Sequence, residues 1–320
     1  MEPVRWGILS TGRINRLAIF EPVRQTEHAE VVAVASREQE RAESYAREHG
    51  IGRAHGSYEA LLGDPEVEAV YVSLPNSLHA EWSVRALEAG KHVLVEKPFS
   101  RHPEEVERAF DTAERTELVL MEAFMYRHHD QTRKLVETVA SGRIGVLRHL
   151  RSSFSFILAN PEDVRMRPEL DGGALMDLGC YCISGCRLLG GEPELVVGRQ
   201  LLGPTGVDVR FSALLEFGDD VSAEFHCAFD LPDGAGLEAS GSEHRALVRE
   251  PFRTIDPHIE LNGERIEVDH TDRYLLQLEN FSAAVRGEAE PLLGRDDALG
   301  QARTINALYR SAESGTAVSL

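Results

Sequence analysis

The chain lacks long apolar runs and any excess of positive charge. Its 320 residues hold 34 lysines and arginines against 53 aspartates and glutamates, a net charge of −19. Such a surface repels nucleic acid and anionic membranes, because nonspecific binding to both depends on basic residues. The apolar stretch 67–74 is too short to cross a bilayer and contains Glu68. We therefore expect neither a nucleic-acid partner nor a membrane segment.

The amino-terminal stretch also lacks the basic segment followed by an apolar segment that marks a secretory leader. It passes from Met1 directly into a strand-like run at residues 4–9. The expected location is therefore the cytoplasm.

Cysteine is scarce, and its spacing does not suit a metal. Three of the four cysteines fall within seven residues: Cys180, Cys182 and Cys186. A zinc site needs two pairs of ligands, each pair separated by two or more residues. We therefore expect buried thiols and no metal. The adjacent pair His128-His129 also raises the question of a metal, but neighbouring helical residues do not face each other, and a helix start at Asp130 is the simpler interpretation.

Lysine is scarcer still, since only Lys91, Lys97 and Lys134 occur among the 34 basic residues. Arginine takes most surface roles in this chain. A lysine that stands before a proline at the end of a strand, as Lys97 does, is therefore a candidate for special chemistry. The alternative is an ordinary solvated charge.

The first 120 residues alternate strands with helices. The apolar runs at 31–35, 69–74 and 92–95 are typical of parallel strands buried on both faces. Polar or amphipathic helical segments separate them and end at glycines such as Gly50 and Gly90. This order predicts an α/β fold with an N-terminal Rossmann domain, a doubly wound parallel sheet, over residues 1–123.

The pattern changes after residue 123. Segments 147–156, 195–202, 208–217 and 222–229 resemble long strands, with helices expected near 131–141, 174–189, 274–285 and 296–314. Residues 124–320 are therefore predicted to form a substrate-binding and oligomerisation α+β domain with a large, open, mostly antiparallel sheet. An uncovered sheet face is costly in water, so we expect self-association through it.

The turn after the first strand is a candidate pyrophosphate site. It comprises Ser10, Thr11, Gly12, Arg13 and Ile14. The dinucleotide fingerprint has three glycines that let the backbone approach the phosphates at a helix start. Only Gly12 is in register. The strand before the turn and the helix after it favour a nucleotide site over an ordinary tight turn.

The end of the second strand indicates which dinucleotide binds. An NAD site places an acid here for the ribose 2′-hydroxyl, whereas this chain has Ser36 and Arg37. Together with Arg41, these side chains can hold a 2′-phosphate. NADP is therefore expected, with NAD less favoured. The alternative is that Arg37 is a surface residue at a helix start.

Three side chains suit proton and hydride chemistry. Lys97 follows Glu96 at the carboxyl end of a predicted parallel strand, where α/β sheets bind ligands. Pro98 sets the backbone direction, and a cis bond is possible there. Asp177 and Tyr181 are four residues apart and share one helix face. A carboxylate, a phenol and a lysine can relay a proton while a hydride leaves carbon.

Several blocks in this order resemble the Gfo/Idh/MocA oxidoreductases. The blocks are residues 6–12, Glu96-Lys97-Pro98, residues 121–127, residues 172–181 and residues 301–312. The resemblance covers essentially the whole chain. The tyrosine at 181, with the Cys-Tyr-Cys run around it, is similar to the branch that holds dimeric dihydrodiol dehydrogenase, NADP-dependent xylose dehydrogenase and sugar ketoreductases.

The resemblance implies roles for particular residues. Lys97 would bind the reacting oxygen near the nicotinamide, and Asp177 and Tyr181 would complete the catalytic site. The residues implied near the cofactor are Leu74, Pro75, Asn76, His79, Glu96 and Lys97. Those implied in the substrate pocket are Tyr126, Arg127, Phe154 and Arg165.

The resulting hypothesis is an oxidoreductase that moves hydride between NADP(H) and a hydroxyl or carbonyl carbon of a sugar or diol. One alternative is a ketoreductase acting on a nucleotide-linked sugar. Another is a regulatory protein that senses dinucleotide without catalysis, but that role predicts loss of the lysine or its partners. The substrate, the direction of reaction and the number of subunits stay open.

Overall fold

The computed structural model describes residues 2–320, which form two compact units. The first unit contains the chain up to Ser100, residues 104–125 and Asp272–Ala298, and the second contains the remainder. The expected boundary after residue 123 lies two residues before the break at 125/126. The segment Asp272–Ala298 differs from the expectation, because it returns to the first unit although the sequence places it after the second sheet.

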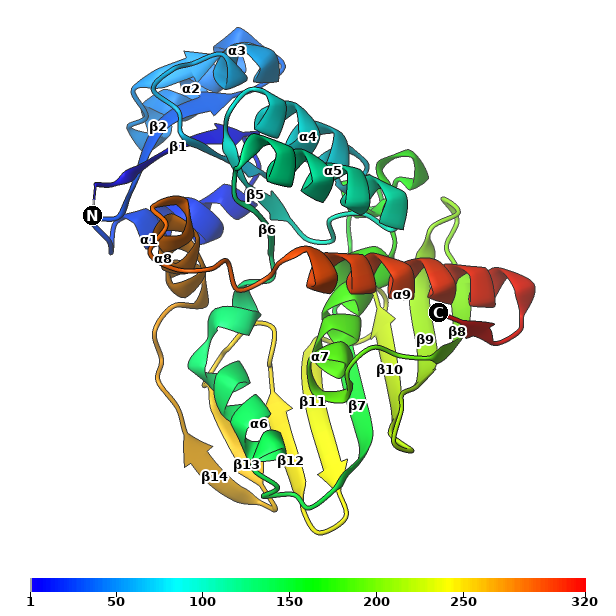
Figure 1. Ribbon diagram of the computed structural model, residues 1–320. Helices are drawn as coiled ribbons and strands as arrows, with labels where there is room; N and C mark the ends of the chain where they lie inside the picture. Colours follow the sequence, from blue (N-terminus) through cyan, green and yellow to red (C-terminus); the bar gives the residue numbers. More distant parts are fainter. Residues whose placement is uncertain (1) are drawn as a thin grey trace. The chain divides into compact units, whose positions relative to one another are not determined.

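The first unit contains a six-stranded parallel sheet in the order β3-β2-β1-β4-β5-β6 (Figure 1). Its strands are β1 (Val4–Leu9), β2 (Ala29–Ala35), β3 (Arg53–His55), β4 (Ala69–Val72), β5 (His92–Glu96) and β6 (Leu120–Ala123). The order reverses between β1 and β4, as in a doubly wound Rossmann sheet. The predicted fold of this half is confirmed.

The helices of this unit are η1 (Arg16–Phe20), a π-helical turn, α1 (Glu21–Val23), α2 (Gln39–His49), α3 (Tyr58–Leu62), η2 (Asn76–Leu78), α4 (His79–Glu88), α5 (Pro103–Thr116) and α8 (Arg273–Val285). Two of them, α2 and α3, have an end or a start signal that is visible in the sequence, whereas α4 begins after Leu78 without a side-chain cap. Ser57 Oγ accepts from the N–H of Ala60 at 3.1 Å and caps α3. Gly50 ends α2 in the left-handed region, with φ 71°.

Helix α8 joins the first unit through ring packing and ion pairs. Phe281 packs on Trp6 of β1 with ring centroids 5.0 Å apart. Beyond the end of α8, Arg286 Nη1 pairs with Glu68 Oε1 at 3.0 Å. These contacts explain why residues 272–298 leave the second unit. They join positions more than 200 residues apart, which hydrophobic periodicity does not reveal.

The second unit contains a nine-stranded sheet in the order β14-β13-β12-β11-β7-β10-β9-β8-β15. Its strands are β7 (Leu147–Ser155), β8 (Leu195–Leu202), β9 (Asp208–Glu216), β10 (Ser222–Ala228), β11 (Gly234–Gly241), β12 (Arg245–Arg249), β13 (His258–Leu261), β14 (Glu264–Glu267) and β15 (Val318–Ser319). All pairs are antiparallel except β7 with β10. The predicted mostly antiparallel sheet is confirmed, and β11 to β15 extend it.

Helices pack on one face of this sheet (Figure 1). They are α6 (Asp130–Ala140), α7 (Cys180–Gly190), which follows the π-helical turn η6 (Leu175–Gly179), and the second part of α9 (Arg295–Ser314). Short 3-10 turns are η3 (Met125–His128), η4 (Val164–Met166) and η5 (Pro168–Leu170). Along β9, Phe211, Ala213 and Leu215 are buried while Ser212 and Leu214 are exposed. One face is therefore apolar and covered, and the opposite face reaches solvent.

Candidate active site

The residues expected to hold a nucleotide gather at one edge of the six-stranded sheet. Register places Leu9 beside Ala35, and Val72 beside Val95. Because these strands are parallel, their carboxyl ends meet at the same edge. The segments that follow the strands are Ser10–Ile14, Ser36-Arg37, Leu74–Asn76 and Lys97-Pro98. Open α/β sheets bind ligands at this edge.

Side chains hold the first turn where glycines usually stand. Ser10 Oγ accepts from the N–H of Gly12 at 3.0 Å and lies 2.7 Å from Ser73 Oγ. Asn15 is fully buried, accepts from Ser73 Oγ at 2.7 Å, and donates to the carbonyl of Ser10 at 3.1 Å. A Cβ on Gly12 would meet Ser10 Oγ at 3.1 Å, which is a tight contact. The missing glycines are thus replaced by a polar network that fixes the same turn.

The tip of β2 carries positive charge next to an aromatic ring. Ser36 is buried, while Arg37 and Arg41 are exposed. Arg41 Nε donates to Thr11 Oγ1 at 2.7 Å, which joins the β2 side of the site to the first turn. Burial raises the pKa of Tyr58, and the nearby charges of Arg37 and Arg41 oppose that rise. Tyr58 was not expected here, because it lies in a short helix with no motif.

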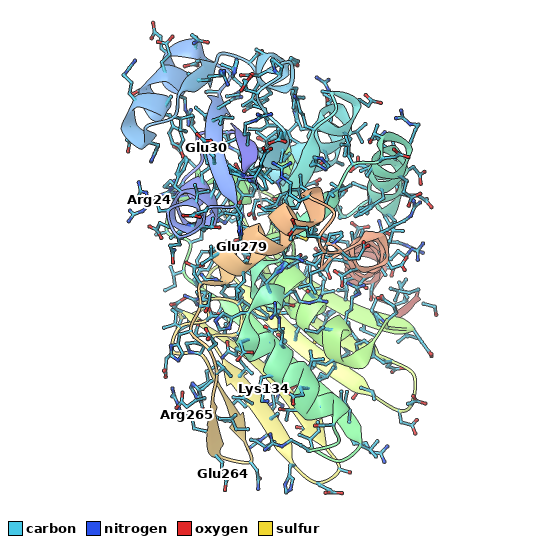
Figure 2. The ribbon with its side chains drawn as sticks, turned by 60° about the vertical axis from the view of Figure 1, so that its left-hand side comes forward. Arg24, Glu30, Lys134, Glu264, Arg265 and Glu279 are labelled. Carbon is cyan, nitrogen blue, oxygen red and sulfur yellow. The ribbon has the colours of Figure 1, made fainter. Side chains whose placement is uncertain are left out.

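The three lysines have separate environments. Lys134 lies on α6 and pairs with Glu137 at 2.8 Å, as a surface residue (Figure 2). Lys91 is buried before β5, and its Nζ donates to the carbonyls of Asp64 and Val67 at 2.8 and 2.7 Å. Lys97 follows β5 at its carboxyl end. Of the three, Lys97 is the one at the nucleotide edge.

Side chains from two strands, β4 and β6, hold the turn that carries Lys97. The bond between Lys97 and Pro98 is cis. The N–H of Phe99 donates to Glu122 Oε1 at 2.8 Å, and Glu122 is 1% exposed. Tyr71 donates to Glu96 through its hydroxyl. The segments on both sides of Lys97 are therefore held by β4 and β6. This restricts the positions that the Lys97 side chain can adopt.

His79 connects this turn to the loop after β4. Its Nδ1 lies 2.8 Å from the carbonyl oxygen of Pro98, and its Nε2 lies 2.8 Å from that of Leu74. Complete burial lowers the pKa of His79 to about 4, and the charge of Lys97 acts in the same direction. The ring is therefore neutral near pH 7 and donates one hydrogen bond. His79 therefore joins the loop after β4 to the Lys97-Pro98 turn, and its role beside the cofactor stays a prediction.

Asp177 lies in a π-helical turn of the second unit. The N–H of Cys180 donates to the carbonyl of Leu175, five residues back, and π-helical turns often occur at functional sites. Asp177 Oδ2 accepts from Arg165 Nε at 2.7 Å, and Arg165 also pairs with Asp163 at 3.2 Å. The Asp177 charge raises the pKa of Arg165. This ion pair favours the carboxylate form of Asp177 and joins two of the expected site residues.

Tyr181 is the second residue of α7 and packs among aromatic rings. Its ring centroid is 5.6 Å from that of Phe154 and 5.3 Å from that of Phe252. Arg253 lies 5.2 Å above the Phe154 ring. Aromatic packing of this kind fixes a ring firmly while leaving its polar tip for other contacts. Phe252 and Arg253 were not anticipated, because they lie in an irregular segment after β12.

Tyr126 and Arg127 both reach α7. The Tyr126 hydroxyl donates to Ser184 Oγ at 2.7 Å, and Arg127 Nη1 lies 3.3 Å from the same atom. Tyr126 is fully buried, with its ring 6.0 Å from that of Tyr181. Arg127 is partly exposed. The contacts of Tyr126 support the Tyr181 ring, and its role in a substrate pocket stays a prediction.

The cysteines and His129, which the sequence raised as possible metal ligands, have structural surroundings. All four cysteines are free and buried, and burial raises the pKa values of Cys182 and Cys186. His129 caps α6 by accepting from the N–H of Gln131 at 3.1 Å, so the helix-start interpretation of this pair holds for His129. No group of His, Cys, Asp and Glu among residues 2–320 could hold a metal ion. Nor does any helix in that range have the length and apolarity needed to cross a membrane.

Comparison with known proteins reveals similarity over nearly the whole chain. Residues 4–124 match the model of the Gfo/Idh/MocA oxidoreductase family with an NAD-binding Rossmann fold, and residues 132–265 match a C-terminal domain of the same family. An NADP(+)-dependent D-xylose 1-dehydrogenase of Haloferax volcanii is 39% identical over 98% of this chain and 99% of that protein.

Two further relatives carry other substrates in their names. A trans-1,2-dihydrobenzene-1,2-diol dehydrogenase of Xenopus laevis is 36% identical over 67% of this chain and 65% of that protein. A crystal structure of a 3-ketoreductase from Actinomadura kijaniata, in complex with NADP and TDP-benzene, has a TM-score of 0.91 and 31% identity. The match extends over 97% of this chain and 98% of the ketoreductase chain.

Proposed function

This chain belongs to the Gfo/Idh/MocA family of oxidoreductases, and we propose that it transfers a hydride between NADP(H) and a hydroxyl or carbonyl carbon of a sugar or diol. The first unit binds the dinucleotide, and the second unit supplies most of the substrate pocket. The observation that carries the proposal is the place of Lys97, which is clamped by its neighbours at the carboxyl edge of the Rossmann sheet.

The residues at that edge suit NADP. Gly12 is the one fingerprint glycine in register, and its turn is held by Ser10 and Asn15. Arg37 and Arg41 supply positive charge near Ser36, where an NAD site would have an acid. The dehydrogenase from Haloferax volcanii is named for NADP(+), and the ketoreductase was crystallised with NADP. When bound, this cofactor accepts or supplies the hydride.

The chain's own residues orient the substrate and move the proton. Lys97 Nζ donates to the reacting oxygen and stabilises negative charge there. Tyr181 Oη gives a proton to that oxygen in reduction and receives it in oxidation. Asp177, held as a carboxylate by Arg165, accepts from a neighbouring substrate hydroxyl.

Sugars and diols are the favoured substrates, because the dehydrogenases from Haloferax volcanii and Xenopus laevis are named for a pentose and a diol. A nucleotide-linked keto-sugar is the second candidate. It is favoured by the similarity to the 3-ketoreductase, which was solved with TDP-benzene and matches along the length of both chains. The two candidates differ in whether a nucleotide group improves turnover.

Nicotinamide absorbance during turnover tests the proposal. Purified protein is supplied with NADP+ or NADPH and a panel of aldoses, ketoses, trans-diols and nucleotide-linked keto-sugars. We expect turnover of at least one class, loss of turnover in Lys97→Ala, and retention in Lys134→Ala, which removes a surface lysine. Protein that binds NADPH but turns over none of these compounds would instead support a dinucleotide sensor and overturn the proposal.

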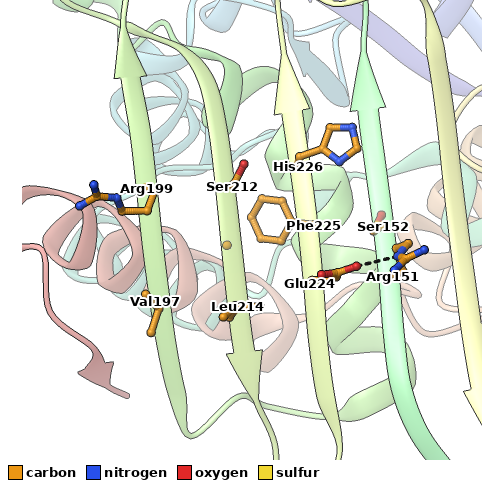
Figure 3. A pocket seen from close by; sticks show the side chains of 10 residues that line it. Arg151, Ser152, Val197, Arg199, Ser212, Leu214, Glu224, Phe225 and His226 are labelled. Carbon is orange, nitrogen blue, oxygen red and sulfur yellow. Dashed lines mark hydrogen bonds and ion pairs between the residues drawn. The ribbon is translucent and has the colours of Figure 1, made fainter.

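We also infer that the chain associates with a second copy through the outer face of the nine-stranded sheet. This face carries a shallow hollow that includes Val197 and Leu214, and Leu214 is 54% exposed (Figure 3). Beside it, Arg151 pairs with Glu224 at 2.7 Å. A second copy would present the same mixture of apolar and paired charged groups, which suits a two-fold interface.

Sedimentation velocity tests this inference. We expect Leu214→Glu to shift the chain to a smaller species, because a buried, unpaired carboxylate opposes association. Leu292→Glu places the same charge at a leucine of the first unit that is 46% exposed and should leave the assembly unchanged. A monomeric wild-type protein would refute the inference.

We place the protein in the cytoplasm, as expected from the sequence. The support is that its cysteines are free thiols, which a reducing compartment preserves. Cell fractionation with an antibody to the chain tests this, and recovery outside the cytoplasmic fraction would contradict it.

A further inference from the structure

Asp208 is a buried carboxylate that the mechanism above does not use. It is the first residue of β9, faces the covered side of the nine-stranded sheet, and is 2% exposed. Its Oδ2 accepts from the N–H of Leu175 at 2.7 Å, and its Oδ1 accepts from the hydroxyl of Tyr309 at 2.9 Å. Both oxygens of a buried acid are therefore committed to other elements of the unit.

The N–H of Leu175 belongs to the first turn of the helix that carries Asp177 and Tyr181. Ala174, at the N-cap position, provides no side-chain hydrogen bond. Helix starts leave N–H groups without partners inside the helix, and an acid near them is stabilising. Here the capping acid comes from β9, 33 residues away in the sequence. The start of the helix is thus attached to the sheet rather than to its own loop.

Gly173 makes room for this attachment. A Cβ at residue 173 would lie 2.2 Å from Asp208 Oδ1, and φ of Gly173 is +126°. Both facts exclude ordinary side chains at this position. The close approach of the Asp208 carboxylate to the backbone before Asp177 therefore depends on glycine.

Tyr309 extends the attachment to a second segment. The guanidinium of Arg101 lies 5.3 Å from the centre of the Tyr309 ring and pairs with Asp171 at 3.0 Å. Asp171 precedes Asp177 by six residues, and Arg101 follows Lys97 by four. One group of side chains thus touches the loop before the Asp177 helix, the first turn of that helix, and the segment that leaves the Lys97 turn.

We propose that Asp208 is a positioning residue of the active site and that, with Tyr309, it sets the place of the helix that carries Asp177 and Tyr181. This inference rests on the proposed function, because it gives the two carboxylate oxygens of Asp208 a part in positioning the catalytic groups Asp177 and Tyr181. Displacement of a catalytic group by about 1 Å is enough to lower turnover strongly. The role is separate from substrate contact, because Asp208 is enclosed within its unit.

The charge of Asp208 makes the role sensitive to pH. Burial raises the pKa of Asp208 to about 6, although the hydrogen bonds from Leu175, Ala174 and Tyr309 oppose the rise. The titratable and charged groups around it are the Tyr309 phenol, the Cys227 thiol and, through Tyr309, Arg101. Below about pH 6 the carboxylate takes up a proton and accepts more weakly from Leu175. Turnover should therefore fall on the acid side of pH 6.

Steady-state kinetics of two variants across pH 5 to 9 tests the proposal, with the substrate that the wild type turns over. Asp208→Asn keeps the shape and an acceptor oxygen but removes the charge, and Tyr309→Phe keeps the ring beneath Arg101 but removes the donor. We expect kcat to fall about tenfold to a hundredfold in Asp208→Asn, while KM for NADPH stays within about twofold. The acid limb near pH 6 should disappear in Asp208→Asn and shift in Tyr309→Phe.

The matched control is Asp64→Asn in the first unit. Asp64 is also buried and accepts from the N–H of Glu66 at 2.9 Å, but its carboxylate pairs with His55 and Arg53 of the first unit and not with the helix that carries Asp177. This control should lower thermal stability and leave kcat and its pH profile unchanged. If Asp208→Asn does not fold, kcat and the acid limb of Tyr309→Phe, which retains the carboxylate, decide whether the positioning role holds.

Wild-type kcat and an unchanged acid limb in both variants would overturn the positioning role while leaving the proposed function intact. A fall in kcat in Asp64→Asn as large as in Asp208→Asn would overturn it too, by showing only general destabilisation. Absence of turnover in the wild type refutes the proposed function itself, and the positioning role falls with it.

Discussion

His128 is a buried imidazole that the folded chain does not accommodate as a cation. It is 1% exposed, and neither ring nitrogen has a hydrogen-bond partner among residues 2–320. Burial lowers the pKa of His128 from 6.5 to about 3, and the charges of Arg133 and Arg127 act in the same direction. We predict that His128→Phe stabilises the protein, because it replaces two unpaired polar atoms with a ring of similar size.

The magnitude follows from proton linkage. Below pH 6.5 the unfolded chain binds a proton that folded His128 refuses until about pH 3. The stability associated with neutral His128 is therefore complete above pH 6.5 and is lost as the pH falls. The loss reaches about 2 kcal/mol at pH 5. At pH 7.5 the gain from removing the unpaired nitrogens is about 1–3 kcal/mol, so the advantage of His128→Phe should grow to about 3–5 kcal/mol at pH 5.

Urea unfolding at pH 7.5 and pH 5.0 measures both the gain at neutral pH and its growth in acid. The difference in unfolding free energy between wild type and variant removes the effects of other titrating groups. His244→Phe, at an exposed turn, is the control. Its difference in unfolding free energy from the wild type should not grow between pH 7.5 and pH 5.0. The prediction fails if His128→Phe is no more stable than the wild type at pH 7.5, or if its gain in unfolding free energy is the same at both pH values. Either result would mean that the ring has a partner.

Three further predictions concern the site. Arg37→Asp places an acid at the β2 tip and should weaken NADPH binding at least about tenfold while favouring NADH, as measured by fluorescence titration. Tyr181→Phe should lower kcat by about a hundredfold and leave NADPH binding unchanged, because only the proton carrier is lost; stopped-flow measurement of the hydride step checks this. Gly173→Ala should lower the unfolding free energy by about 1–3 kcal/mol in denaturant titration, because φ is positive and the Asp208 carboxylate occupies the Cβ position.

Local chemistry made the first unit predictable. Continuous β-branched strands, helices ended by Gly50, and a cap at Ser57 each reflect forces between near neighbours in the sequence. The same is true of Lys97 at the end of a strand and of a helical segment around Asp177 and Tyr181, although its first turn is π-helical and not α-helical as expected. Such features need no knowledge of distant contacts, so the sequence alone is enough.

Distant contacts account for what the sequence did not reveal. Strands β11 to β14 are short or interrupted by polar residues, and their pairing depends on β7. The return of α8 to the first unit rests on Phe281 meeting Trp6. Asp208 and Tyr309, 101 residues apart, carry no motif until the fold brings them together. The missing fingerprint glycines were also ambiguous until Ser73 and Asn15 were found to hold the turn.

The central proposal is that Lys97 and Tyr181 act on one substrate oxygen beside NADP, while Asp177 binds a neighbouring substrate hydroxyl. A crystal structure of the complex with NADP and a turned-over substrate or product tests it most directly. We expect the 2′-phosphate against Ser36 and Arg37, with Lys97 Nζ and Tyr181 Oη both within hydrogen-bond distance of the reacting oxygen. A substrate oxygen that contacts neither atom, or a 2′-phosphate bound away from the β2 tip, would contradict it.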